Sequence, residues 1–358
     1  MFRQDLDSYC IYPSISFSSI NKGYLNHGYF LLFSFFVFPN NCFNAYTNDT
    51  TGHCELNYDV LIVVERHVKF KVNTLLGELC MMKNTALSWR EVLSNDTMHT
   101  ITGDVRVIEA FPIPQLQTER RVWIYLPRSY NESARRYPVL YMHDGQNVFD
   151  QATSWGSEWG VDETLEQLTI DEPELETIVV AIDNGGEQRN DEYNFTINAE
   201  YGFGGKGDDY ATFLAETLKP YIDSHYRTLS GPEHTMIGGS SFGAYISLYT
   251  AIRYPTQFNR VSGISFVMWQ DNGAIIRLIQ QSVISPTLRL YLSIGELETD
   301  NPDFNRIAHE HITLVRQTLI AAGVADSRIR FDVIPDGTHH ESTWGSLFAE
   351  AHRWLIQP

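Results

Sequence analysis

The chain has 358 residues, of which 43% are hydrophobic and 20% charged, the balance of an ordinary globular protein. It carries 26 lysines and arginines against 44 acids, a net charge of -18. A field of that sign repels phosphate backbones and anionic lipid headgroups, so we expect no nucleic-acid partner.

The first 80 residues differ in composition from the rest. They are rich in Phe, Tyr, Asn and Cys without a sustained period, and they contain all four cysteines, whose spacing matches no metal-binding pattern. The apolar run at 29–38 is about half the length of a membrane helix and lacks a signal-peptide cleavage site. We therefore interpret residues 1–80 as an extension of doubtful function, with Met81 or Met82 as the natural start. The expected location is the cytoplasm, with secretion or the periplasm as alternatives.

Residues 81–103 form a lead-in, after which short β-branched and aromatic runs alternate with amphipathic stretches. The predicted strands are 105–111, 121–126, 138–142, 177–182, 235–238, 260–265, 288–294 and 330–334. The predicted helices are 160–168, 210–224, 243–254, 272–281, 304–322 and 344–356. This alternation predicts one α/β domain over 104–358, with a mostly parallel twisted sheet of about eight strands flanked by helices. The glycine-rich stretch 185–208 is predicted to leave the sheet edge and build a pocket.

The strongest local signal is the pattern G-x-S-x-G at residues 239–243. An apolar strand precedes it and an amphipathic helix follows it, which is the setting of a nucleophile elbow. Ser241 would present its hydroxyl at a helix N-terminus, where N–H groups favour developing negative charge. A glycine- and serine-rich turn without chemistry is the alternative interpretation.

A nucleophilic serine needs a histidine base and an acid that orients the histidine. His339 and His340 follow the last predicted strand, on the loop where the base belongs; we favour His339, and a surface histidine pair is the alternative. The strand at 288–294 leads into Glu296, Glu298 and Asp300, any of which is placed to be the acid.

Acyl transfer also needs N–H donors for the oxyanion, one after the nucleophile and one in the loop after the third strand. Phe242 supplies the first, and Gln146 is our choice for the second. His143 and Asp144 precede the serine in the chain, so we expect them to shape this turn rather than to join a triad.

Together these segments resemble an esterase family of the α/β-hydrolases, which contains bacterial siderophore trilactone hydrolases, ferric enterobactin esterase-like enzymes, feruloyl esterases and esterase D. The resemblance covers about residues 104–357. The segments that carry it are 137–150, 158–165, Arg189 with Glu192-Tyr193, 218–223, the elbow at 238–243, and 339–344. It implies an α/β-hydrolase fold with Ser241 as nucleophile and His339 as base. The short Gly-x-x-acid turn of the feruloyl esterases favours Glu298 among the three carboxylates. Some trilactone hydrolases of the family work with a Ser-His dyad, so the resemblance leaves open that no acid takes part.

The expected activity is two-step hydrolysis of a small-molecule carboxylic ester through an acyl-enzyme, with no metal or organic cofactor. Trp155, Trp159 and Trp269 are predicted to line the pocket, with core packing as the alternative. Arg189 is predicted to hold an anionic or catecholate group, with a surface role as the alternative. An acyltransferase on the same residues and a non-catalytic binding module are alternative functions. Trilactone siderophores, feruloylated sugars, acetylated carbohydrates and S-acyl glutathione are all compatible substrates, and any oligomeric state is compatible with the sequence.

Overall fold

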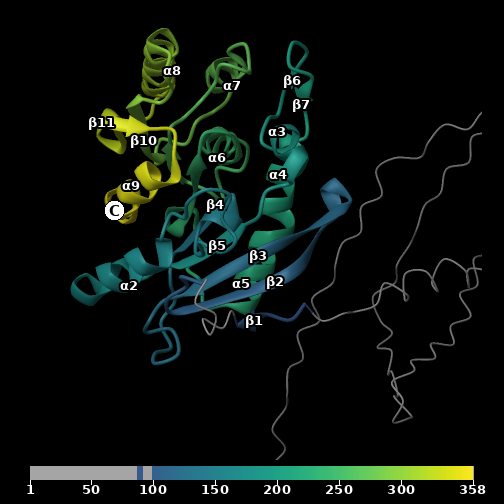
Figure 1. Cartoon of the computed structure of the whole chain (residues 1–358), viewed down its shortest axis with the longest axis vertical. Helices are drawn as coiled ribbons and strands as arrows, with labels where there is room; N and C mark the ends of the chain where they lie inside the picture. The colour runs from purple at the N-terminus through teal and green to yellow at the C-terminus, as the bar shows by residue number, and fades with distance from the viewer. Residues whose placement is uncertain (1–86, 92–98, 358) are drawn as a thin grey trace, which may run out of the picture. The chain divides into compact units, whose positions relative to one another are not determined.

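A nine-stranded sheet organises the residues that this computed structural model describes, 87–91 and 99–357 (Figure 1). The spatial order is β1-β2-β3-β5-β4-β8-β9-β10-β11. The strands are β1 Arg90–Glu91, β2 Asp104–Ile113, β3 Thr118–Leu126, β4 Val139–His143, β5 Ile178–Ile182, β8 Thr235–Ser240, β9 Arg260–Ile264, β10 Arg289–Leu297 and β11 Ile329–Thr338. The expectations for residues 1–80, including the four cysteines, lie outside the described residues.

Six neighbouring strands, from β5 through β4, β8, β9 and β10 to β11, run parallel, and β1, β2 and β3 extend the sheet antiparallel at the β5 side. Every residue of β4, β5 and β8 is buried, as expected for parallel strands covered on both faces, and β4 and β5 are apolar almost throughout. All eight predicted strands are present, and the two-residue β1 is the ninth. The predicted α/β fold with a mostly parallel sheet is confirmed.

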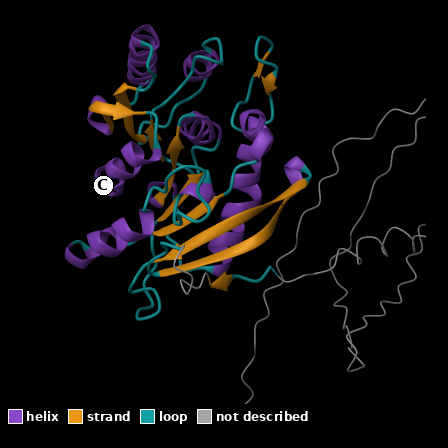
Figure 2. Cartoon of the chain, in the orientation of Figure 1, coloured by secondary structure: helices purple, strands orange, loops and turns teal. Residues whose placement is uncertain are grey.

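Helices cover both faces of the sheet (Figure 2). They are α2 Val161–Asp171, α3 Arg189–Glu192, α4 Gly207–Phe213, α5 Lys219–His225, α6 Phe242–Arg253, α7 Ala274–Gln281, α8 Pro302–Ala321 and α9 Glu341–Ile356, and a π-helical segment, Leu214–Leu218, joins α4 to α5. Buried residues of α4 to α8 belong to one hydrophobic cluster, and those of α2 and α9 belong to another. Strand β10 supplies both, since Leu290 and Leu292 face the first cluster and Tyr291 faces the second.

The stretch between β5 and α4 is the predicted excursion from the sheet. It contains α3 and a small hairpin of β6 Ile197–Asn198 and β7 Phe203–Gly204, which is separate from the main sheet. In Figure 1 the hairpin stands beside α3 at the top of the view. The excursion thus brings side chains of residues 189–204 toward loops at the carboxyl ends of the parallel strands that are distant from it in the sequence.

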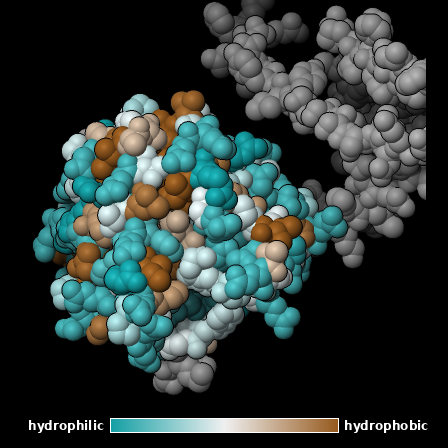
Figure 3. Space-filling view, turned by 90° about the horizontal axis from the view of Figure 1, so that it is seen from above, coloured by the Kyte–Doolittle hydropathy of each residue, from teal (hydrophilic) through white to brown (hydrophobic). Residues whose placement is uncertain are grey.

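The face of the protein shown in Figure 3 is largely polar, with small apolar patches. The most exposed large apolar side chains among the described residues include Val283, Ile197, Trp155 and Tyr201. No helix in the described ranges has the length and apolar character needed to cross a membrane.

Candidate active site

The predicted site residues lie at the carboxyl ends of the parallel strands. Ser241 directly follows β8, the loop with Gln146 follows β4, Glu298 directly follows β10, and His339 directly follows β11. Because these strands are parallel neighbours in one sheet, their carboxyl ends share one edge. That edge is where α/β sheets hold their ligands.

Ser241 forms the tight turn between β8 and α6. Its φ of 55° and ψ of -124° are a backbone conformation that non-glycine residues rarely adopt. The strand end is held because the Ser241 N–H donates to the carbonyl of Ile264 in β9, at 3.0 Å. A Cβ on Gly239 would lie 3.2 Å from Gly243 Cα and 3.3 Å from His143 Cβ, so this turn needs its flanking glycines. The half-buried Ser241 therefore stands at the N-terminus of α6, as the strand-turn-helix pattern predicted.

Of the candidate acids, Glu298 is the one in contact with His339. Its Oε2 lies 2.5 Å from Nδ1 of His339, while its Oε1 accepts hydrogen bonds from Ser265 Oγ at 2.8 Å and from Gly295 N at 2.6 Å. The Glu298 residue is only 6% exposed, whereas the His339 side chain keeps 34% of its surface open. This arrangement fixes the acid and leaves the imidazole accessible to a ligand.

The hydrogen bonds to Glu298 also set its charge. Burial by itself would raise the pKa of Glu298, but the bonds from His339, Gly295 and Ser265 together outweigh burial, and the pKa lies below its ordinary value. The carboxylate is therefore ionised at neutral pH. An ionised partner at Nδ1 keeps the proton on that nitrogen and leaves Nε2 free to accept one.

Trp344 in α9 holds the histidine from a second side. The rings of His339 and Trp344 meet edge to face, with centroids 5.1 Å apart, and the Trp344 indole N–H donates to Ser265 Oγ at 2.8 Å. Ser265 thus links the tryptophan to the acid. Sequence reasoning did not predict the contacts of Ser265 and Trp344; the one local signal is the tryptophan five residues after His339.

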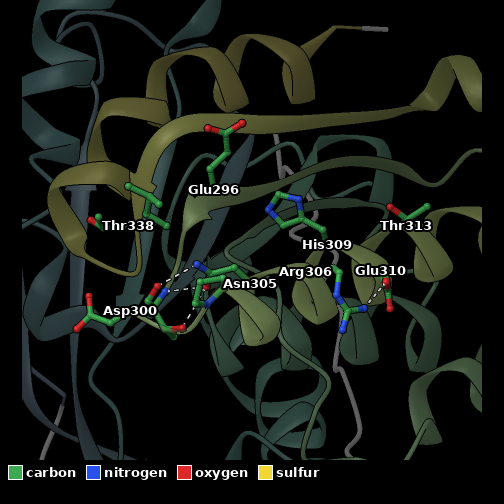
Figure 4. A pocket seen from close by; sticks show the side chains of 11 residues that line it. Glu296, Asp300, Asn305, Arg306, His309, Glu310, Thr313 and Thr338 are labelled. Atoms are coloured by element: carbon green, nitrogen blue, oxygen red, sulfur yellow. Dashed lines mark hydrogen bonds and ion pairs between the residues drawn. The ribbon is translucent and has the colours of Figure 1, made fainter.

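The other acid and base candidates have different surroundings. His340 Nδ1 accepts the N–H of Ser342 and caps α9. Glu296 and Asp300 are exposed. They line a groove of about 830 Å³ between the loop that follows β10 and helix α8 (Figure 4). Glu298 is not among the lining residues of that groove. Of the three carboxylates, only Glu298 contacts His339.

The loop after β4 carries the predicted oxyanion donor. Asp144 has a φ of 56° and leads into a single 3-10 turn, Gly145–Asn147, whose first N–H groups have no acceptor within the turn. A Cβ on Gly145 would lie 2.7 Å from the carbonyl carbon of Ile182, so the loop packs directly on the end of β5. The side chain of Gln146 accepts from the N–H of Asn184, which points this side chain toward the β5 loop.

His143 and Asp144 shape this loop, as the sequence predicted. His143 Nδ1 lies 3.0 Å from the hydroxyl of Tyr210, and complete burial lowers the pKa of His143 to about 4. Asp144 forms a two-bond ion pair with Arg189, and within the described ranges no hydrogen bond joins it to a histidine nitrogen. Neither residue is placed like the pair formed by Glu298 and His339.

The four predicted pocket residues differ in their surroundings. Trp155 is 68% exposed. Trp159 is 8% exposed and packs on Trp344 within the core, which matches the alternative of core packing. Trp269 is 37% exposed and contacts the ring of Phe242, beside the elbow. Arg189 lies over the same Phe242 ring, with its charge paired to Asp144.

A partly exposed aromatic group lies beside Phe242. The hairpin of the excursion brings Tyr201 and Phe203 against Trp269, with centroids 5.1 and 6.5 Å from the tryptophan ring, and Phe203 also contacts Phe242. Sequence reasoning assigned a pocket to this excursion but did not name Tyr201 or Phe203. Within the described residues, no group of His, Cys, Asp and Glu side chains is arranged to hold a metal ion.

Known proteins of one family are similar to this chain. The family described as "Putative esterase" matches residues 113–355. The uncharacterized protein YjcH of Bacillus subtilis is 30% identical over 246 residues, covering 68% of this chain and 93% of YjcH. The iron(III) enterobactin esterase of Dickeya dadantii is 24% identical over 288 residues, covering 75% of this chain and 59% of that protein. A ferulic acid esterase of known structure has the same fold, with a TM-score of 0.53 and 18% identity, covering 70% of this chain and 97% of that one.

Proposed function

The chain belongs to this esterase family and is a carboxylic ester hydrolase, and from this premise we propose that Ser241, His339 and Glu298 hydrolyse a small-molecule ester through an acyl-enzyme. One observation carries the proposal. The buried Glu298 carboxylate, which forms hydrogen bonds with Ser265, Gly295 and His339, holds Nδ1 of an accessible histidine. This pair lies at the same edge of the sheet as the strained Ser241. The acid-to-base contact of a triad is thus present, and the proposed nucleophile lies on a neighbouring loop at the same edge.

In the first half-reaction, Ser241 Oγ attacks the ester carbonyl carbon and His339 Nε2 takes the hydroxyl proton. The backbone N–H groups of Phe242 and Gln146 stabilise the resulting oxyanion. When the intermediate collapses, the carbon–oxygen bond to the alcohol breaks and His339 gives its proton to the departing oxygen. An acyl-Ser241 ester and a free alcohol result.

In the second half-reaction, water takes the place of the alcohol. His339 removes a proton from the water as it attacks the acyl carbon, and the same two N–H groups stabilise the second oxyanion. Collapse returns the proton to Ser241 and releases the carboxylic acid. Glu298 stays ionised throughout and stabilises the imidazolium in both halves.

The aromatic group around Phe242 supports a substrate with a planar ring. Tyr201 and Trp269 are exposed beside the residue that follows the nucleophile, and faces of this kind bind aromatic rings by stacking and edge contacts. The similarity to proteins named as enterobactin and ferulic acid esterases supports the same choice. The proposal covers a ring on the acid side of the ester and a ring on the alcohol side.

The test is hydrolysis of p-nitrophenyl acetate and butyrate by the wild type and by Ser241→Ala and His339→Ala. We expect each variant to lose about 10³- to 10⁶-fold in kcat, because members of a triad act as a unit. Ser240→Ala and His340→Ala are the matched controls and should stay near the wild-type rate. Circular dichroism and thermal unfolding show whether each variant is folded.

A fluorophosphonate probe tests the nucleophile directly. It should add one phosphonyl group to Ser241, detected by mass spectrometry of the digested protein, and should not label Ser241→Ala. Full activity in a folded Ser241→Ala variant, or labelling at a different residue, would refute the proposal.

A further inference from the structure

Asp144 is a buried residue in a left-handed backbone conformation, and side-chain bonds hold it there. Its Oδ1 accepts from Arg189 Nε at 2.7 Å and from Asn184 Nδ2 at 2.6 Å, and its Oδ2 accepts from a terminal nitrogen of Arg189 at 2.9 Å. Its backbone N–H donates to the Tyr193 hydroxyl. A non-glycine residue at a φ of 56° persists only when its surroundings hold it, and here four hydrogen bonds do so.

The conformation of Asp144 determines where the next residues lie. Gln146, which supplies the proposed oxyanion donor, is two residues further on in the single 3-10 turn that begins after Asp144. Gly145 between them is pressed against the end of β5, and the Gln146 side chain is tied to Asn184. Few torsions separate the two residues, so a shift of Asp144 moves the N–H of Gln146.

Arg189 contacts the second donor residue as well. Its guanidinium carbon lies 5.8 Å from the centre of the Phe242 ring and 5.1 Å from that of Tyr193. One side chain from the excursion therefore contacts Asp144 on one side and Phe242 on the other. These belong to the two loops that carry the proposed oxyanion N–H groups.

From these contacts we infer that the Arg189–Asp144 ion pair is a positioning element that sets the separation of the two oxyanion donors, and that it is not the ligand of a charged substrate group. The inference rests on the proposed function. It differs from the sequence-based expectation for Arg189 because two of the guanidinium nitrogens are already bonded to one carboxylate, which also neutralises the charge.

The test compares a neutral ester, p-nitrophenyl acetate, with an anionic one, mono-p-nitrophenyl succinate. Arg189→Met should lower kcat for both esters by the same factor, about 10²-fold as for a lost oxyanion donor, and leave both KM values within a factor of about three. Arg189→Lys should lose nearly as much, because a lysine keeps the charge but lacks the two-bond fork. A substrate-binding arginine would behave differently, with KM rising for the anionic ester alone and Lys restoring it.

A trifluoromethyl ketone inhibitor gives a readout that a merely structural role would not change. It forms a hemiketal oxyanion on the nucleophile, so its affinity should fall in Arg189→Met by the same factor as kcat. Acetate, the ground-state product, should inhibit as in the wild type. Unchanged affinity for the ketone in a folded Arg189→Met enzyme would overturn the inference.

Two further variants control for folding. Glu192→Gln removes the buried ion pair with Arg120 from the same helix α3 and should lower the melting temperature without changing kcat. Asn184→Ala removes one bond to Asp144 but keeps the ion pair, and should show a smaller loss confined to kcat. If Arg189→Met does not fold, a kcat in Asn184→Ala equal to that of the wild type overturns the inference. Failure of the proposed function would show itself separately, as full activity in Ser241→Ala.

Discussion

Glu298 and Asp144 are buried carboxylates on two different loops at the carboxyl-end edge of the sheet, and they have different partners. After β10, Glu298 contacts the imidazole of His339; after β4, Asp144 pairs with the guanidinium of Arg189. Burial would raise the pKa of either carboxyl, but the hydrogen bonds and charges of the partners outweigh burial, and both pKa values lie below the ordinary one. Both carboxylates are therefore ionised at neutral pH.

The partner decides what each pair can do. An imidazole gains and loses its proton near neutral pH, whereas a guanidinium keeps its charge at every pH at which proteins fold. The side chain of His339 is 34% exposed and that of Arg189 is 20% exposed. The first pair suits proton transfer and the second suits a fixed geometry, which is the division of roles that we propose.

The largest expected effect follows from removing the charge of the first pair. Glu298→Gln keeps the size of the side chain but no longer stabilises an imidazolium, and we expect kcat for p-nitrophenyl butyrate to fall about 10³- to 10⁴-fold. Glu296→Gln, which changes an exposed carboxylate in the same loop, should leave kcat unchanged. A loss of only a few-fold in Glu298→Gln would indicate a Ser-His dyad.

Removing the charge of the second pair should lower the stability of the fold as well as kcat. Asp144→Asn leaves Arg189 without its anionic partner, and we expect a loss of about 3 kcal/mol in the free energy of unfolding at pH 7. Because the folded pKa of Asp144 is depressed, its contribution is present above the ordinary pKa and is lost as the pH falls through the folded value. The difference between wild type and variant should therefore shrink below about pH 4.

Urea unfolding at pH 7, 5 and 3 measures this dependence. Asp300→Asn, a change at an exposed carboxylate, should unfold like the wild type at all three values. A difference between Asp144→Asn and the wild type that stays constant from pH 7 to pH 3 would contradict the assignment of the stability to this ion pair.

The smallest expected effect concerns the aromatic group formed by Trp269, Tyr201 and Phe203 beside Phe242. Trp269→Ala removes ring contacts with Phe242 and Tyr201, and we expect KM for p-nitrophenyl ferulate to rise about fivefold, since one aromatic contact contributes about 1 kcal/mol. Its KM for ethyl acetate, which carries no ring, should stay the same. Trp269→Phe should restore most of the affinity, and an equal rise for both esters would argue against a ring-binding role.

Residues close together in the chain were predicted well. The elbow at Ser241 needs only a strand, two glycines and a helix in succession, and these signals lie within about 20 residues. The strands and helices were found for the same reason, because apolar residues repeat every second or about every fourth position over a few turns. Their ends differ from the predicted ones by a few residues, as for β11, which continues to Thr338.

Contacts between distant residues could not be predicted in this way. Arg189 and Asp144 are 45 positions apart, and nothing local to either one indicates that they form an ion pair rather than a substrate site. Trp159 and Trp269 look alike in the sequence, yet one packs in the core and the other is exposed beside Phe242. Burial of this kind depends on which elements meet.

By itself the sequence determined the α/β architecture, the position of the strand-turn-helix at Ser241 and the loops on which the proposed acid, base and oxyanion donors lie. Only the tertiary structure decided which carboxylate contacts His339, because that contact needs Ser265 at the end of β9 and Gly295 in β10 to hold Glu298. The physical reason is the separation along the chain of the residues that interact. Backbone conformation follows mainly from neighbouring residues, whereas the partner of a buried charge is selected by the distance and desolvation that the assembled sheet imposes.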